Sequence, residues 1–159
     1  MRTLCFSRWM SIPLLLVGLV GTFPLAITRA EDVPRFVRPE QATTYIDPVT
    51  KTELTVLIDQ HLGGTAELTL GYLVVPPGVD VPDHIHQSTE TFYILSGEME
   101  QTSDGKVQTI SAGMACLVPA NTTTRHTVKS EDSVHALVIW TPGGEAKRIV
   151  KEWPVKTAQ

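Results

Sequence analysis

The sequence has few basic residues, very little cysteine and almost no helical periodicity. Lysine and arginine number 13 against 17 aspartates and glutamates, which gives a formal net charge of −4. No basic patch occurs, and this argues against nucleic acid or an anionic lipid surface as a partner. No repeat or low-complexity stretch is found either.

A long apolar run occurs only near the start of the chain, where it resembles a secretory signal. Arg2 and Arg8 both precede the apolar stretch 12–20. The segment Thr28-Arg29-Ala30, directly before Glu31, has small residues at its first and third positions. This pattern is typical of a signal peptide cleaved after Ala30. A membrane anchor needs about 20 apolar residues, and this run is shorter and interrupted by proline and glycine. We therefore expect a secreted or periplasmic protein that meets the membrane only through its export signal.

Cleavage after Ala30 would remove 30 of the 159 residues and leave 129, the size of one domain with a single core. Three arginines and no acid would be lost, so the balance becomes 10 basic against 17 acidic residues, a net charge of about −7. One cysteine, Cys116, would remain, which excludes an intramolecular disulfide. We expect Cys116 to be buried and unreactive. Stability must then come from the core, a metal or a partner subunit.

Beyond residue 48 the sequence is a succession of short β-strand patterns. Residues 31–48 contain three prolines, which favour an extended lead-in. The Asp104-Gly105 pair is typical of a two-residue hairpin turn, and only 145–151 fit a short helix. Short apolar or alternating strand patterns bounded by glycine and proline indicate an all-β sandwich or barrel, and they cover 52–58, 66–75, 90–95, 98–102, 106–110, 114–118, 126–129 and 134–140.

Three histidines and one glutamate have spacings that suit a metal site. His84 and His86 are two residues apart, so on a strand their side chains point to the same face. Glu90 follows four residues later, and His126 comes from a distant part of the chain. Two imidazoles and a carboxylate from one hairpin, completed by a third imidazole, form a ligand set for a first-row transition metal. The set contains no thiolate, so a structural zinc site of the cysteine type is not expected.

The segment 78–97 resembles the first motif of the cupin superfamily. That motif is glycine, five residues, His-x-His, three residues, glutamate, six residues and glycine. The five positions are filled here by Gly78, His84, His86, Glu90 and Gly97. Five defined residues at fixed spacing make this a specific resemblance.

The second cupin motif is matched in part. Gly113 and Pro119 fit it, whereas Asn121 stands where glycine is usual and four residues, not two, separate it from His126. Asparagine can adopt the left-handed backbone conformation that glycine usually supplies. His126 is therefore the candidate third histidine, and His135, on the following strand, is its rival.

The resemblance covers about residues 65–142 and implies a double-stranded β-helix barrel of the jelly-roll-like kind. It implies one divalent transition metal (Fe, Mn, Ni, Cu or Zn) in the barrel mouth, held by His84, His86, Glu90 and His126. We thus expect a signal peptide at 1–30, an extended segment with a first strand at 31–64, a cupin core at 65–142 and a tail at 143–159.

The leading functional hypothesis is an exported, metal-dependent enzyme that resembles small single-domain cupin oxygenases of the quercetin-dioxygenase-like kind. Its substrate would be a small organic molecule bound to the metal, and Glu90 would be a permanent ligand or a catalytic proton carrier. A redox-neutral decarboxylase, isomerase or lyase and a non-catalytic small-ligand-binding protein remain alternatives. Because a small sandwich has exposed sheet edges, residues 31–58 are a candidate for pairing in a homodimer.

Overall fold

The structure, a computed structural model, describes residues 35–157. The predicted signal peptide, residues 1–30, lies outside the described residues. No helix among the residues described has the length and apolar character needed to span a membrane. The elements of the described chain, in order, are η1 (Pro39–Gln41), β1 (Thr43–Ile46), β2 (Glu53–Ile58), β3 (Thr69–Val75), β4 (Asp80–Ile85), β5 (Thr89–Ser96), β6 (Glu98–Ser103), β7 (Lys106–Ser111), β8 (Ala115–Val118), β9 (Thr123–Thr127), β10 (Val134–Thr141), α1 (Glu145–Ile149) and η2 (Val150–Glu152).

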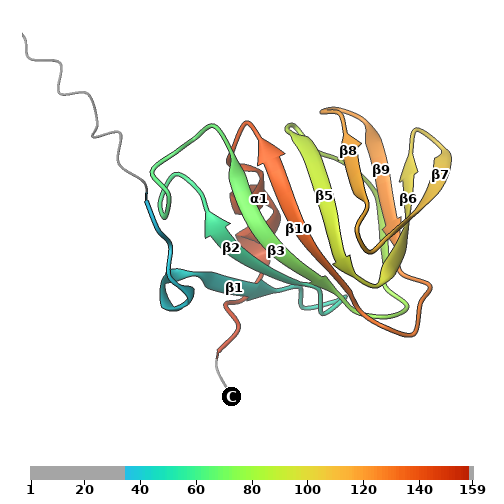
Figure 1. The fold of residues 1–159 in the computed structure, drawn as a ribbon, viewed down its shortest axis with the longest axis horizontal. Helices are drawn as coiled ribbons and strands as arrows, with labels where there is room; N and C mark the ends of the chain where they lie inside the picture. The colour runs from blue at the N-terminus through green and yellow to red at the C-terminus, as the bar shows by residue number, and fades with distance from the viewer. Residues whose placement is uncertain (1–34, 158–159) are drawn as a thin grey trace, which may run out of the picture. The chain divides into compact units, whose positions relative to one another are not determined.

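The strands form two antiparallel sheets (Figure 1). The larger sheet has the order β1-β2-β3-β10-β5-β8 and the smaller one the order β4-β9-β6-β7. Strands that are far apart in the sequence are therefore neighbours, as β10 is between β3 and β5. The predicted all-β, double-stranded β-helix architecture is confirmed.

The core lies where alternate side chains of both sheets point inward. On β10, Val134, Ala136, Val138 and Trp140 are each at most 2% exposed, while the residues between them are half-buried. Burying a large apolar side chain contributes about 1.5–3 kcal/mol. Strand β10 is consequently the most deeply packed strand of the larger sheet, and the inward face of that sheet becomes a wall of the site described below.

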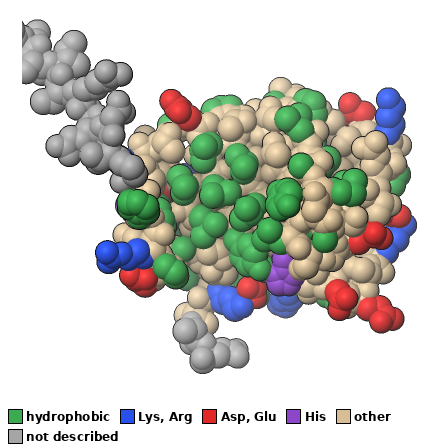
Figure 2. All heavy atoms as spheres, viewed as in Figure 1, with side chains coloured by type: hydrophobic (Ala, Val, Ile, Leu, Met, Phe, Trp, Pro, Cys, Tyr) green, Lys and Arg blue, Asp and Glu red, His purple; other side chains and the backbone are tan. Residues whose placement is uncertain are grey.

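The outer face of the larger sheet also carries apolar side chains. Tyr93 and Leu95 on β5 are 45% and 46% exposed, and Leu117 on β8 is 64% exposed. Figure 2 shows hydrophobic side chains gathered over this face of the molecule. Antiparallel sheets commonly have one polar, solvated face, and a contiguous apolar patch is a feature of interaction surfaces.

Two predicted turn conformations are confirmed. Asp104 and Gly105 have φ values of 46° and 78° and join β6 to β7, as a two-residue hairpin requires. Asn121 has a φ of 64°, so it supplies the left-handed residue for which the second motif uses glycine. The motif glycine Gly97 has a φ of 81°, and a Cβ atom there would lie 2.6 Å from the carbonyl oxygen of Ser133. A larger residue cannot occupy position 97 without moving the backbone.

The C-terminal segment folds back along the larger sheet. Residues predicted to form a short helix, 145–151, form α1 followed by η2. The backbone N–H of Ile46 donates to the Pro154 carbonyl at 3.0 Å, and that of Lys156 donates to the Thr44 carbonyl at 2.8 Å. This segment therefore covers the outer edge of β1. Pairing of residues 31–58 with a second copy of the chain stays a prediction.

Candidate metal centre

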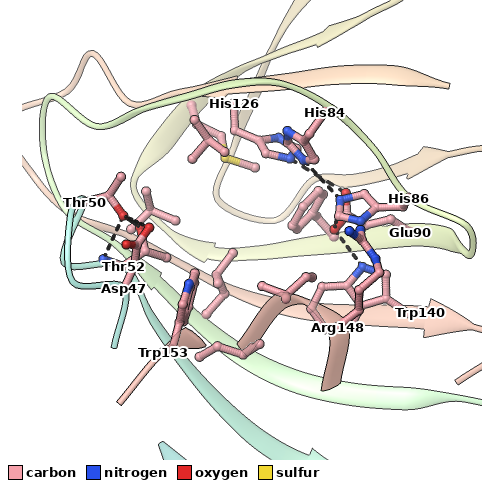
Figure 3. Close-up of a pocket in the computed structure, with 17 residues that line it drawn as sticks. Asp47, Thr50, Thr52, His84, His86, Glu90, His126, Trp140, Arg148 and Trp153 are labelled. Carbon is pink, nitrogen blue, oxygen red and sulfur yellow. Dashed lines mark hydrogen bonds and ion pairs between the residues drawn. The ribbon is translucent and has the colours of Figure 1, made fainter. Parts of the chain in front are cut away.

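The structure brings the candidate ligands together from three strands. His84 lies near the end of β4, His86 directly after it, Glu90 at the start of β5 and His126 on β9. The three histidines each offer a ring nitrogen, and these nitrogens lie within 4.8 Å of one another. Figure 3 shows the three rings on one side of a cavity, with Glu90 beside them. Because β4 pairs with β9, His84 and His126 lie on adjacent strands of the smaller sheet.

Glu90 is buried beside the histidine cluster, with 2% of its surface exposed. Its Oε1 accepts a hydrogen bond from Trp140 Nε1 at 2.9 Å and lies 3.2 Å from His86 Nε2. Its Oε2 lies 3.8 Å from His126 Nε2 and, within the described residues, has no hydrogen-bond partner. A buried carboxyl oxygen without a partner is costly, so this atom needs a ligand or a proton.

All three histidine rings are oriented by an oxygen that faces Nδ1. A backbone carbonyl, a carboxylate and an amide oxygen can only accept a hydrogen bond, so each Nδ1 carries a proton. The Nε2 atoms of His84 and His126 therefore keep their lone pairs, whereas His86 Nε2 also faces the Glu90 carboxylate and can carry a second proton while no metal is bound. The three contacts are His84 to the Pro82 carbonyl at 2.7 Å, His86 to Glu145 Oε1 at 3.0 Å and His126 to Gln101 Oε1 at 2.6 Å.

The orientation of the Gln101 amide is itself fixed by its neighbours. Gln101 Nε2 donates to the carbonyl oxygen of Thr102 at 3.2 Å, and it also contacts the hydroxyls of Ser103 and Thr124. The opposite amide orientation would place two carbonyl oxygens against each other. The amide oxygen therefore faces His126, and it sets which nitrogen of that ring is protonated.

These atoms fit a divalent metal ion. His84 Nε2 and His86 Nε2 are 3.1 Å apart, and two imidazole nitrogens bound about 2.1 Å from one ion at a right angle lie about 3.0 Å apart. Without a metal ion, a proton on His86 Nε2 can be shared with His84 Nε2 or with Glu90 Oε1, and a metal ion would take the place of that proton. Glu90 Oε2 is a further buried atom that has no hydrogen-bond partner among the described residues. Imidazole and carboxylate ligands suit Fe, Mn, Ni, Cu or Zn.

The electrostatic environment keeps two of the histidines neutral. Burial lowers the pKa of His126 to about 4. Burial also lowers the pKa of His84, with a smaller contribution in the same direction from His86. For His86, burial acts in the same sense, but the hydrogen bonds and charges of Glu90 and Glu145 outweigh it and raise the pKa. Neutral imidazole is the form that binds a metal.

The cluster opens into a cavity of about 250 Å³ between the two sheets. Most of its wall is apolar and comes from β2, β3, β5, β6, α1 and the segment after η2, with Leu54, Leu73, Phe92, Met99, Ile149 and Trp153 among the lining residues. Asp47, Thr50 and Thr52 lie across the cavity from the histidines (Figure 3). An apolar wall around a polar cluster is the usual form of a small-molecule site.

Three residues near the cluster are absent from the sequence-based set. Glu145 and Arg148 belong to the C-terminal helix, and nothing in the sequence shows that this helix reaches the barrel mouth. Gln101 is 2% exposed and takes an inward position on β6. Its place next but one to Met99 in an alternating strand is a signal that could have marked it as a buried polar residue.

The remaining candidates lie elsewhere. His135 is on the outward side of β10, where its Nδ1 is 2.6 Å from the hydroxyl of Tyr72, and the structure does not bring it to the cluster. His61 is exposed in a loop. Cys116 is half-buried, and burial raises the pKa of its thiol, so the protonated and less reactive form is favoured.

Burial of His126 predicts a pH dependence for the metal-free protein. The unfolded side chain titrates near about 6.5 and the folded one near about 4, so between these values the unfolded state binds more protons. Titration of His126 should therefore lower the free energy of unfolding by about 3 kcal/mol as the pH drops from 6.5 to 4, and His84, whose pKa burial also lowers, acts in the same direction. Because the pKa of His86 is raised, the stability that its protonation contributes is present below pH 6.5. That stability is lost as the pH rises above 6.5, which is outside this interval.

Urea unfolding of chelator-treated protein across this pH interval is the measurement. His126→Leu should flatten the slope relative to the unsubstituted chain, and replacement of exposed His61 by asparagine is the matched control. An equal slope in the His126 variant would contradict the assignment.

Comparison with known proteins supports the assignment of the fold. The family model described as a cupin domain matches residues 71–142. No curated protein sequence gives a match. An RmlC-like cupin from Shewanella frigidimarina is similar in structure, with 18% identity, 72% of this chain and 96% of that chain covered, and a TM-score of 0.58.

Two further structures show the same fold. A predicted oxalate decarboxylase from Thermotoga maritima has 22% identity and a TM-score of 0.57 over 67% of this chain and 97% of that chain. KdgF from Halomonas sp. has 16% identity and a TM-score of 0.56 over 69% of this chain and 94% of that one. The family model identifies residues 71–142 as a cupin domain, and the described chain shares the fold of these cupin structures.

Proposed function

We propose that the protein is a metal-dependent enzyme of the oxygenase type that acts on a small, mostly apolar organic molecule. The observation that carries the proposal is the convergence of three histidine Nε2 atoms with Glu90 Oε2, which has no hydrogen-bond partner within the described residues, at one end of an apolar cavity. The proposed metal ligands are His84, His86, Glu90 and His126. A bound divalent ion would lower the pKa of a substrate oxygen and bring dioxygen next to it.

The cavity limits the size of the substrate. A cavity of about 150 Å³ holds one benzene molecule, so the 250 Å³ available here suits a single substituted ring or a molecule of similar size. A three-ring flavonoid would require the cavity to open. The size and the apolar wall favour a phenol, an enol or an aromatic acid, which would place its acidic oxygen at the histidine end.

The chain's own residues supply the remaining parts of the reaction. Trp140 holds Glu90 Oε1, so the carboxyl group has a fixed orientation and its Oε2 is directed at the cluster. From there, Oε2 can take a proton from a substrate oxygen or bind the ion itself. Phe92, Leu73 and Trp153 line the wall and exclude water from the reacting groups.

A redox-neutral reaction is the second candidate, because an unpartnered carboxyl oxygen is also what a decarboxylase, isomerase or lyase needs as its base. A non-catalytic ligand-binding protein would use the same cavity without turnover. Uptake of dioxygen separates the first candidate from the second, and product formation separates both from the third.

The metal is tested on purified protein. We expect about one divalent ion per chain, and a chelator should lower the free energy of unfolding by about 3 kcal/mol if the ion was present at roughly 100 times its Kd. His84→Ala and His126→Ala should lose the ion, whereas His135→Ala, on the outer side of β10, should keep it. Metal analysis by mass spectrometry, with melting curves before and after chelation, gives the answer. Metal-free protein with an unchanged melting curve would refute the proposal.

The reaction type is tested with an oxygen electrode and a panel of phenols, enols and aromatic acids. The metal-loaded protein should consume dioxygen with at least one of them, and Glu90→Gln should reduce turnover by about 10²–10⁴-fold because the proton acceptor is lost. Exposed Glu98→Gln is the control for the loss of one acidic side chain outside the cavity. Product formed without oxygen uptake would support the redox-neutral alternative, and binding without any product would support the ligand-binding one.

We also propose that the protein is exported after cleavage near Ala30 and forms a homodimer. The N-terminal sequence pattern supports export. The apolar outer face of the larger sheet supports pairing, since contact between two copies there would remove Tyr93, Leu95 and Leu117 from water. We expect the intact mass of the secreted protein to be that of a chain that begins at Glu31. We expect light scattering to give the mass of two chains, and Leu117→Lys to reduce it to the mass of one. An uncleaved product would contradict export, and a monomeric unsubstituted protein would contradict pairing.

A further inference from the structure

A buried acidic side chain lies next to the cluster but belongs to the tail of the chain. Glu145, at the start of α1, is 4% exposed, and its Oε1 accepts the Nδ1 proton of His86 at 3.0 Å. The two residues are 59 positions apart in the sequence. The family match ends at residue 142, so Glu145 lies outside the part of the chain that matches the cupin model.

The carboxylate is held in place from two sides. Arg148 Nε donates to Glu145 Oε1 at 2.9 Å. Arg148 Nη2 donates to the same oxygen and, at 3.3 Å, to the carbonyl of Ile85, the residue before His86. At the start of the helix, the backbone N–H of Gly144 donates to Thr69 Oγ1 at 3.0 Å. The start of α1 is thus hydrogen-bonded to β3 through Gly144, and Arg148 links Glu145 to the end of β4.

The three histidines differ in the acceptor that faces Nδ1. His84 has a backbone carbonyl and His126 an amide oxygen, whereas His86 has a carboxylate. A hydrogen bond to a carboxylate is the stronger kind. It fixes the ring orientation and makes the other nitrogen a better electron donor to a metal.

We propose that Glu145 is a positioning residue for the metal site, holding His86 Nε2 toward the ion, so that the C-terminal helix is a working part of the site. This inference rests on the proposed metal binding. A purely structural role, in which Glu145 only docks the helix, would change the stability of the metal-free protein and leave the affinity for metal unchanged.

The experiment is a titration of the chelator-treated full chain with Co²⁺, followed by the absorption of the bound ion. Glu145→Ala should raise the dissociation constant by about 10–100-fold. Glu145→Gln has the same shape and keeps an acceptor, but it lacks the charge, so its loss of affinity should be smaller. The positions of the Co²⁺ absorption bands should be unchanged in the Gln variant, because the ligands remain the same. Glu152→Gln, an exposed position in η2, is the matched control and should bind like the unsubstituted chain.

The outcomes separate this inference from the proposed function. Unsubstituted protein that fails to bind Co²⁺ would overturn both. Normal binding by the unsubstituted chain, with an unchanged dissociation constant in the Ala and Gln variants, would overturn the role of Glu145 alone. Should the Ala variant not fold, the Gln variant decides: weaker binding supports the inference, and equal binding refutes it.

Discussion

The site depends on where three protons are held. Each histidine ring presents its Nδ1 to an oxygen that can only accept, and the three Nε2 atoms consequently converge at one end of an apolar cavity. In a low-dielectric interior, unpaired polar atoms are destabilising. A metal ion would give all three Nε2 atoms and Glu90 Oε2 a common partner. The hydrogen bonds to the three Nδ1 atoms therefore determine which nitrogens face the common point.

The fold imposes that arrangement by joining the two sequence motifs through the backbone. Strands β4 and β9 are neighbours, which places His84 and His126 on one sheet. The N–H of Asn121 donates to the carbonyl of His86 at 2.9 Å, so the left-handed turn of the second motif fixes the end of the first. Glu90 comes from the opposite sheet, where it is held by Trp140 on the neighbouring strand. The cavity is the space that these two sheets leave between them.

Local rules sufficed for much of this architecture. Alternation predicted that His84 and His86 share a face, and turn chemistry predicted the conformations of Asp104-Gly105 and Asn121. The roles of Glu145 and Gln101 were beyond reach because each contacts a histidine that is 59 or 25 positions away. Neither contact leaves a periodic signal. Strand β4 carries no aliphatic stripe, because of its inward residues only Val81 packs against the core and His84 belongs to the histidine cluster.

His126 and His86 are held by different parts of the structure. His126 is deeply buried and neutral, so it belongs to the rigid part of the cluster. His86 is linked through Glu145 and Arg148 to a short helix that also provides Ile149 to the cavity wall. The same segment therefore contacts both a candidate ligand and the space where a substrate would lie. Any displacement of α1 would therefore alter the shape of the cavity and the orientation of His86 together.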